Sequence, residues 1–253
     1  MFTKAIVRTP SSSMINGLTE ANLGAPDYTL ALQQHADYIA ALKECGLEVT
    51  TLPALEDYPD ACFVEDAALL TPHCAILTHP GAASRRGEVD HIAPAVSDHY
   101  QNVYRLSGAG HLEAGDVMMV GSHFYIGLSE RTNVIGAKEL IGILEKHGMS
   151  GSVVKMTEML HLKTGINYLE NHQMLAFGEM LDHPDFATFS RTAIAPDESY
   201  AANCVWVNGT VLVPKGFPKT LNAVQSLGYR TREVDVSEYQ KLDGGLSCLS
   251  LRF

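Results

Sequence analysis

The chain has 253 residues, of which 46% are hydrophobic and 19% are charged, and its formal net charge is −11 at pH 7. This composition is typical of a globular protein with a sizeable core. The acidic balance excludes the basic face that a nucleic-acid partner needs, and no apolar run approaches the length of a membrane span.

The five cysteines are dispersed and show no Cys-x-x-Cys spacing. This usage favours thiols in a reducing compartment over a disulfide framework. The first residues carry Arg8 and Pro10 and contain no apolar stretch of secretory length, so we expect no signal peptide. We therefore predict a cytoplasmic location.

Helical spacing of apolar residues recurs in stretches that end before a glycine. The predicted helices cover residues 27–45, 132–147 and 220–227, and strand-like runs follow them at 47–52, 152–156 and 229–236. Thr132 is the expected N-cap of the second helix. A weaker helix is expected over 88–100, where Pro94 interrupts the pattern unless it lies in the first turn.

Pairs of short apolar strands joined by turn residues lie between these helices. The pairs cover 68–70 with 74–77, 117–120 with 123–126, 166–169 with 173–176, and 204–207 with 210–213. Asn208-Gly209 is a strong hairpin signal for the last pair. A fifth pair is divided between the two ends of the chain, with one strand inside 246–251 and the other at 4–7.

The pattern of two strands, a helix and a further strand repeats about every 40–50 residues, which indicates a radial or stacked repeat. Five such units that close on themselves would remove the exposed sheet edges. No composition shift or linker divides the chain, so we predict a single domain over 1–253. A mixed α/β domain without symmetry remains the alternative on pattern alone.

Chemically active residues stand just before the first strand of several units, where their side chains would point to a common centre. These residues are Asp60, Glu65, Asp66, Glu113, His161 and Cys248. We expect Gly244-Gly245 to present Cys248 in a short strand, where a nearby base would make the thiol a nucleophile. A buried structural cysteine and a core histidine between Leu160 and Leu162 remain the alternatives.

Arg85 and Arg131 occupy comparable loops after the second strand of two successive units. Arginine binds carboxylates with two parallel hydrogen bonds. A site with carboxylates at its base and arginines at its rim suits an α-amino acid with a cationic side chain. Cysteine attack on a guanidinium carbon held by carboxylates is the chemistry that this combination favours.

Four motifs carry a resemblance to a known family. They are Phe63-Val64-Glu65-Asp66, Glu113-Ala114-Gly115-Asp116, His161-Leu162-Lys163-Thr164-Gly165 and Gly244-Gly245-Leu246-Ser247-Cys248. These motifs resemble those of the guanidine-modifying enzymes of the pentein superfamily. The whole chain, from end to end, is most similar to the bacterial dimethylarginine dimethylaminohydrolase family.

The resemblance implies a five-bladed α/β propeller and the hydrolysis of asymmetric dimethylarginine and monomethylarginine to citrulline and dimethylamine or methylamine. It implies that Cys248 is the nucleophile that forms a covalent thiouronium intermediate. His161 would act as general acid and then as base, and Glu113 would hold the substituted side of the guanidinium. No metal and no organic cofactor are implied.

The resemblance also implies the binding residues. Asp66 would bind the guanidinium nitrogens, Asp60 and Glu65 would complete the acidic side, Arg85 and Arg131 would hold the α-carboxylate, and the backbones of Leu18 and Leu242 would meet the α-amino group. Residues 16–27 would form a lid with hinges at Gly17 and Gly24.

Several alternatives stay open at this point. Arginine deiminase and amidinotransferase activities use related chemistry on the same scaffold. A non-catalytic binding propeller is the alternative from another class, and a cysteine protease is disfavoured because the pocket is acidic. The expected partner is a small methylated arginine, with no nucleic acid and no membrane, and a homodimer is left open.

Overall fold

The computed structural model describes residues 1–253, which divide into two compact units. The central unit comprises Glu65–Ala193, and the terminal unit comprises Met1–Val64 together with Ile194–Phe253. Each unit is described by itself below, and the single domain over 1–253 stays a prediction.

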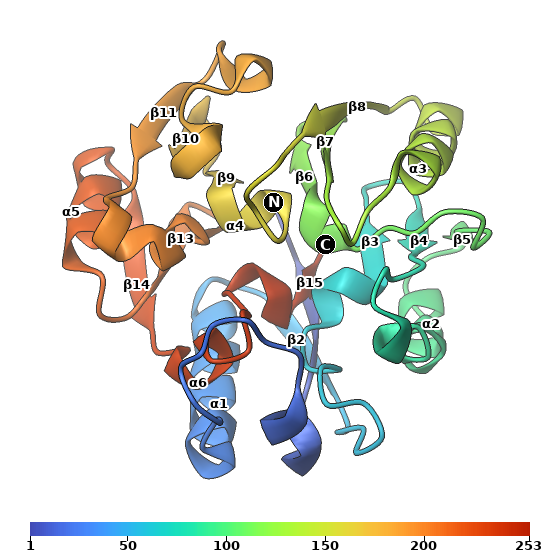
Figure 1. The fold of residues 1–253 in the computed structure, drawn as a ribbon, viewed down its shortest axis with the longest axis horizontal. Helices are drawn as coiled ribbons and strands as arrows, with labels where there is room; N and C mark the ends of the chain where they lie inside the picture. Colours follow the sequence, from blue (N-terminus) through green and yellow to red (C-terminus); the bar gives the residue numbers. More distant parts are fainter. The chain divides into compact units, whose positions relative to one another are not determined.

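The central unit contains three three-stranded sheets of one design. They are β3 (Ala68–Leu70), β4 (Ala75–Leu77) and β5 (Val103–Arg105); β6 (Val117–Val120), β7 (His123–Leu128) and β8 (Ser150–Lys155); and β9 (Ile166–Tyr168), β10 (Gln173–Ala176) and β11 (Ser190–Ala193). In each sheet the first two strands pair antiparallel and the third pairs parallel to the second. In Figure 1 the first strands β3, β6 and β9 lie nearer to one another than the third strands do.

Helices connect the second and third strands of the first two sheets in this unit. They are α2 (Glu88–Ser97) and α3 (Val134–Lys146). The apolar face of α3, including Leu140 and Leu144, packs with Phe124 and Ile126 of β7 in one buried cluster. The third sheet has only short 3-10 turns at Gly178–Met180 and Pro184–Phe186 in the corresponding place, and α4 (Leu162–Gly165) precedes β9.

The terminal unit holds the other two sheets. One contains β15 (Leu251–Arg252), β1 (Lys4–Arg8) and β2 (Glu48–Leu52), with α1 (Tyr28–Glu44) between β1 and β2; the other contains β12 (Val205–Val207), β13 (Thr210–Pro214) and β14 (Arg230–Val234), with α5 (Pro218–Ser226) between β13 and β14, and α6 (Ser237–Gln240) follows. β1 pairs antiparallel with β15, which brings the two ends of the chain side by side (Figure 1). The predicted split repeat is therefore confirmed.

Further 3-10 turns shape the loops before the strands. They are η1 (Ser12–Asn16), η2 (Val64–Ala67), η3 (Ala83–Arg85), η4 (Ala114–Asp116), η7 (Pro196–Ala202) and η8 (Ser247–Leu249). No helix of the protein combines the length and the apolar character that crossing a membrane requires.

The predicted helices and hairpins are confirmed, and the repeat order is confirmed except in the third sheet, where 3-10 turns replace the expected helix. Four further local expectations are wrong or incomplete. Asn133, not Thr132, caps α3, because its side chain accepts from Gly136 N while Thr132 Oγ1 accepts from Glu113 N. The third strands β5 and β11 carry no strong sequence pattern and were not expected. Pro94 lies in the second turn of a helix that continues to Ser97.

The helix α2 tolerates Pro94 because its apolar face is buried. Val89, Ile92 and Val96 are almost fully buried, and burial of side chains of this size offsets the hydrogen bond that proline cannot donate.

The fourth correction concerns the last stretch of the chain. Only Leu251–Arg252 form a strand there, and Cys248 lies on the 3-10 turn η8 that precedes it.

The start of α1 offers a test of the local capping. Asp27 Oδ1 accepts a hydrogen bond from Leu30 N at 3.0 Å, so Asp27→Ala should reduce the free energy of unfolding by about 1 kcal/mol. Asp37→Ala, in the exposed middle of the same helix, is the control and should change it by about 0.5 kcal/mol or less. Urea unfolding measures both variants, and equal midpoints would contradict the capping role.

Candidate active site

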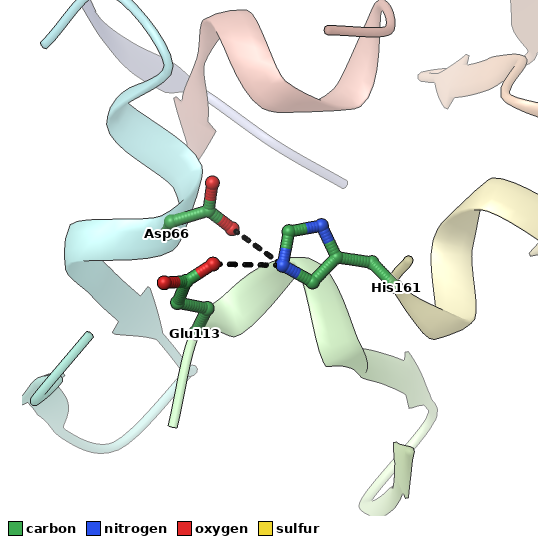
Figure 2. A group of neighbouring side chains, drawn as sticks. All are labelled: Asp66, Glu113 and His161. Atoms are coloured by element: carbon green, nitrogen blue, oxygen red, sulfur yellow. Dashed lines mark hydrogen bonds and ion pairs between the residues drawn. The ribbon is translucent and has the colours of Figure 1, made fainter. Parts of the chain in front are cut away.

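His161, Glu113 and Asp66 meet in the central unit (Figure 2). His161 Nε2 lies 2.9 Å from Glu113 Oε2 and 4.0 Å from Asp66 Oδ1. Asp66 lies on η2, Glu113 stands at the start of η4 and His161 stands at the start of α4. Each residue therefore comes shortly before the first strand of a different sheet. The shared register predicted from the sequence therefore brings these three side chains together.

Gly115 allows this close packing. Its backbone N–H donates to Asp66 Oδ1 at 2.9 Å. A Cβ at this position would lie 2.7 Å from Asp66 Oδ1 and 3.0 Å from Cγ and Nδ1 of His161. Glycine is therefore required here by the approach of the backbone to the carboxylate and the imidazole.

The environment keeps His161 protonated at neutral pH. Burial disfavours the imidazolium, but the negative charges of Asp66 and Asp116, together with the hydrogen bond to Glu113, outweigh it and raise the pKa of His161 from 6.5 to about 9. The imidazolium then donates its Nε2 proton to Glu113 Oε2. A protonated imidazole is what a general acid requires, and the role of His161 as general acid stays a prediction.

Arg85 is buried between two carboxylates. Its Nη1 lies 2.6 Å from Asp66 Oδ2, and its Nη2 lies 2.9 Å from Glu88 Oε2. Burial disfavours the ionised form of Asp66, but the charges of His161 and Arg85 outweigh it and hold the pKa of Asp66 below its usual value. Arg85 thus stabilises the Asp66 carboxylate, and its predicted contact with an α-carboxylate stays a prediction.

Two further ion pairs complete the charged cluster of the central unit. Arg131 is partly exposed, and its Nη1 lies 3.6 Å from Glu113 Oε1. Glu65 is buried, and its Oε1 lies 2.6 Å from Lys163 Nζ. Both arrangements pair a predicted binding residue with an opposite charge.

Cys248 lies in the terminal unit on η8, partly exposed at the edge of the core. The N–H of Gly245 points to Cys248 Sγ with an N···S distance of 3.4 Å. Asn203 holds the same turn, because its Oδ1 accepts from Ser247 N and its Nδ2 donates to Ser247 Oγ. Tyr200 donates from its hydroxyl to the carbonyl of Gly244 at 2.7 Å.

The other predicted residues of the terminal unit also lie together. Leu18 N donates to Asp60 Oδ1 at 3.0 Å. A Cβ at Gly17 would lie 2.8 Å from the same oxygen and 3.2 Å from Leu242 Cδ1. Leu18, Asp60 and Leu242 therefore share one corner of this unit.

The expected lid, residues 16–27, is tied to the turn after α6. Thr19 Oγ1 donates to the carbonyl of Lys241, and Glu20 N donates to Asp243 Oδ2. Gly24 has a φ of +82° and open space around it, whereas Gly17 has an ordinary φ of −61°. Gly24 fits a hinge better than Gly17, which is needed for the close approach of Asp60.

Several site residues escaped the sequence reasoning. Glu88, Lys163 and Asn203 pair with or hold predicted residues. Glu88 stands three positions after Arg85, and Lys163 stands two after His161, so local spacing was the available signal. Nothing local signals Asn203, because its partner Ser247 is 44 residues away.

Comparisons with known proteins show one family. A family model described as "N,N dimethylarginine dimethylhydrolase, eukaryotic" matches residues 25–185. The N(G),N(G)-dimethylarginine dimethylaminohydrolase of Pseudomonas aeruginosa is 54% identical over 254 aligned positions that cover 100% of both proteins. That of Streptomyces coelicolor is 34% identical over 251 positions, which cover 98% of this chain and 96% of the relative.

Solved structures give the same result. A cysteine-to-serine mutant of the Pseudomonas aeruginosa protein, complexed with citrulline, superposes with a TM-score of 0.99 at 54% identity and covers 100% of both chains. The N-terminal domain of ArgZ, an arginine dihydrolase of cyanobacteria bound to its product, gives a TM-score of 0.87 at 19% identity, covering 100% of this chain and 97% of that chain. The latter likeness shows the fold alone.

The repeated sheets and these likenesses define the fold class as the five-bladed α/β propeller of the penteins, which confirms the predicted class. Within this class, the chain belongs to the dimethylarginine dimethylaminohydrolase family.

The contact at Gly115 can be tested by a single methyl group. In Gly115→Ala the new Cβ displaces Asp66 or His161, and we expect activity to fall by about 100-fold, the scale of a misplacement of about 1 Å. Gly142→Ala is the control, because its Cβ meets nothing within 4 Å on α3. That variant should keep full activity and gain up to about 1 kcal/mol of stability. Equal activity of the two variants would contradict the packing argument.

The charge of His161 can be measured directly. The imidazolium should persist through neutral pH and lose its proton as the pH rises through about 9. Glu113→Gln removes one of the groups that raise the pKa, so its titration midpoint should be lower. NMR of ¹³C-labelled histidine follows the titration, with His161→Gln to assign the resonance and the exposed Glu130→Gln as control. A wild-type midpoint at or below 6.5 would contradict this interpretation.

Proposed function

We propose that this protein hydrolyses asymmetric dimethylarginine and monomethylarginine to citrulline and dimethylamine or methylamine. The observation that carries the proposal is the His161 imidazolium held by Glu113 beside the ionised Asp66 (Figure 2), in a chain of the dimethylarginine dimethylaminohydrolase family. A cationic guanidinium with a poor leaving group needs such carboxylates to orient it and such an acid to protonate the amine.

The first half of the reaction forms a covalent intermediate. The thiolate of Cys248 attacks the guanidinium carbon and forms a C–S bond, while the bond to the methylated nitrogen breaks. His161 gives its proton to this nitrogen, so the amine leaves neutral and the substrate remains attached as a thiouronium. We propose that the two compact units form a single catalytic domain over 1–253, in which Cys248 and His161 serve the same substrate.

The second half releases the product. Neutral His161 takes a proton from water, whose oxygen attacks the thiouronium carbon, and the C–S bond then breaks to release citrulline. The hydroxyl of the tetrahedral intermediate gives up the second proton of water as it becomes the citrulline carbonyl, and the released amine takes up this proton in solution. The thiolate is thus restored with His161 protonated again. The N–H of Gly245 near Cys248 Sγ supports this cycle, because hydrogen bonds to the charged form favour the thiolate.

Binding is proposed for the residues around these groups. Asp66 and Glu113 would hold the guanidinium, Asp60 and Glu65 would complete the acidic side, Arg85 and Arg131 would hold the α-carboxylate, and the backbones of Leu18 and Leu242 would meet the α-amino group. Arg131 is better suited to the carboxylate than Arg85, since it is more exposed and its nearest ion-pair oxygen is at 3.6 Å. The segment 16–27 would close over the substrate.

The ion pair of Glu65 affects how strongly the site attracts a cationic substrate. Its ion pair with Lys163 spans 2.6 Å and is largely buried, so the net charge offered to a cationic substrate is smaller than the carboxylates alone suggest. Asp66 is similarly paired with Arg85. The site thus uses paired carboxylates, which orient a guanidinium with a weaker attraction than unpaired carboxylates would give.

The proposed partner is the small methylated arginine, and we propose no metal and no organic cofactor for the reaction. All five cysteines are thiols in the structure, which supports the proposed cytoplasmic location, since thiols persist in a reducing compartment. A homodimer is left as a proposal for measurement by size-exclusion chromatography with light scattering.

The proposal is tested by citrulline release from asymmetric dimethylarginine, monomethylarginine and arginine in parallel. We expect turnover of the methylated substrates, and loss of it by at least about 1,000-fold in Cys248→Ser, because the hydroxyl is a much weaker nucleophile. Cys45→Ser is the matched control, since Cys45 is also partly exposed in the same unit, and it should retain activity.

Each other outcome has a defined meaning. Turnover of arginine in preference to its methylated forms would replace the proposal with arginine deiminase activity on the same residues. A folded wild-type protein silent on all three substrates would instead support a binding propeller. Full activity in Cys248→Ser would exclude the mechanism through a Cys248 thiouronium.

A further inference from the structure

A fully buried carboxylate outside the proposed chemistry joins the loops of the site. Asp116 is the last residue of η4 and has 0% exposure. We propose that Asp116 is a positioning residue that holds the His161, Glu113 and Arg131 segments in one arrangement through its two carboxylate oxygens. This inference rests on the proposed function.

The first branch leads to His161. Asp116 Oδ1 accepts a hydrogen bond from the backbone N–H of Leu162 at 2.9 Å. Leu162 directly follows His161 and begins α4. The carboxylate therefore fixes the peptide bond between His161 and Leu162, and with it the direction in which the imidazole leaves the backbone.

The second branch leads to Arg131. Asp116 Oδ2 accepts from Ser129 Oγ at 2.6 Å, and Ser129 Oγ in turn accepts from the backbone N–H of Arg131 at 3.0 Å. The short first distance is that of a charge-assisted hydrogen bond. One hydroxyl thus transmits the position of Asp116 to the loop that carries Arg131.

The third branch leads to Glu113. The hydroxyl of Thr132 accepts a hydrogen bond from the backbone N–H of Glu113 at 3.1 Å, and its presence beside Asp116 acts to lower the pKa of that carboxyl. The three segments come from before α4, before α3 and before η4, and they are far apart in the sequence. Their common partner is a carboxylate that only accepts hydrogen bonds, which matches three donors converging on it.

The charge of Asp116 also acts on His161. Burial raises the pKa of Asp116, against the opposing effects of the His161 charge and of the hydrogen bonds from Ser129 and Leu162 N. In its ionised form, Asp116 is one of the groups whose negative charge raises the pKa of His161. The charged groups around His161 are Asp66 on η2, with its partner Arg85, and Glu113 before η4, with Arg131 near its other oxygen. Removing the Asp116 charge leaves this set less negative, so the imidazolium should lose its proton at a lower pH.

Asp116→Asn tests the hydrogen bonds and the charge of Asp116 in a side chain of nearly unchanged size. The amide has nearly the same shape but turns a donor toward Leu162 N or toward the Ser129 and Thr132 hydroxyls, so one branch is lost. We expect kcat/KM for asymmetric dimethylarginine to fall by about 10- to 100-fold, as is common for groups that orient a site residue. The His161 midpoint in the NMR titration should move to lower pH.

Ser129→Ala interrupts the Arg131 branch alone. Because Leu162 N keeps its acceptor, the His161 midpoint should change much less than in Asp116→Asn. If Arg131 binds the α-carboxylate, KM should rise several-fold and kcat should change by less than about threefold. An equal fall of kcat in Ser129→Ala and Asp116→Asn would contradict the separate branches.

Glu198→Gln is the matched structural control. Glu198 is also buried and accepts from the backbone N–H groups of Lys219 and Thr220 at the start of α5. It should lower the unfolding midpoint as Asp116→Asn does, yet leave kcat, KM and the His161 titration unchanged.

The proposal is overturned if folded Asp116→Asn keeps the wild-type kcat/KM and His161 midpoint, or if its losses match those of Glu198→Gln. The NMR titration needs no turnover. A wild-type protein that fails to release citrulline would therefore reject the proposed function, while the titration would still decide the role of Asp116.

Discussion

The ion pair between His161 and Glu113, 2.9 Å long and largely buried, is the interaction on which the site depends. An imidazolium cannot remain charged in a buried place unless neighbouring carboxylates compensate for its lost hydration. Those carboxylates in turn need partners, which are Arg85 for Asp66 and the hydroxyl and backbone donors for Asp116. The result is a network in which each buried charge is stabilised by an opposite charge or by hydrogen-bond donors.

The repeat explains how this network is assembled. In each sheet of the central unit, a short turn precedes the first strand, and its side chains reach the corresponding turns of the neighbouring sheets. Because the first strands are only three or four residues long, they serve mainly to hold these turns. An apolar cluster packs α3 against β7 of the second sheet, while the polar residues of the site lie in the turns before the first strands.

The terminal unit uses different means to hold its cysteine. Cys248 lies on a 3-10 turn fixed by side chains from distant segments, among them Tyr38, whose hydroxyl donates to the carbonyl of Leu246 at 2.8 Å. Gly245 is required because its Cβ would lie 2.6 Å from the Asn203 side chain. A rigid turn of this kind reduces the motion of a nucleophile, which is an advantage when the reacting atoms must meet within a narrow range.

The sequence by itself determined the order of strands and helices, the split repeat at the chain ends and the three residues of Figure 2. Helical spacing, glycine stops and the Asn208-Gly209 turn are local signals, and the register of His161, Glu113 and Asp66 repeats with the strands. The same register singled out Cys248, Asp60 and Glu65, and the matching loops singled out Arg85 and Arg131. The family resemblance added Leu18 and Leu242, and the roles of all these residues remain predictions.

Only the tertiary structure decided the partners of these residues. Arg85 could not be placed against Asp66, nor Lys163 against Glu65, because ion pairs across 19 and about 100 positions leave no local pattern. Asn133 replaced Thr132 as the cap of α3 since the Thr132 hydroxyl is used by Glu113, and Pro94 stays inside α2 because burial of that helix outweighs one missing hydrogen bond. Competition among distant contacts settled each of these cases, and a linear pattern carries no information about that competition.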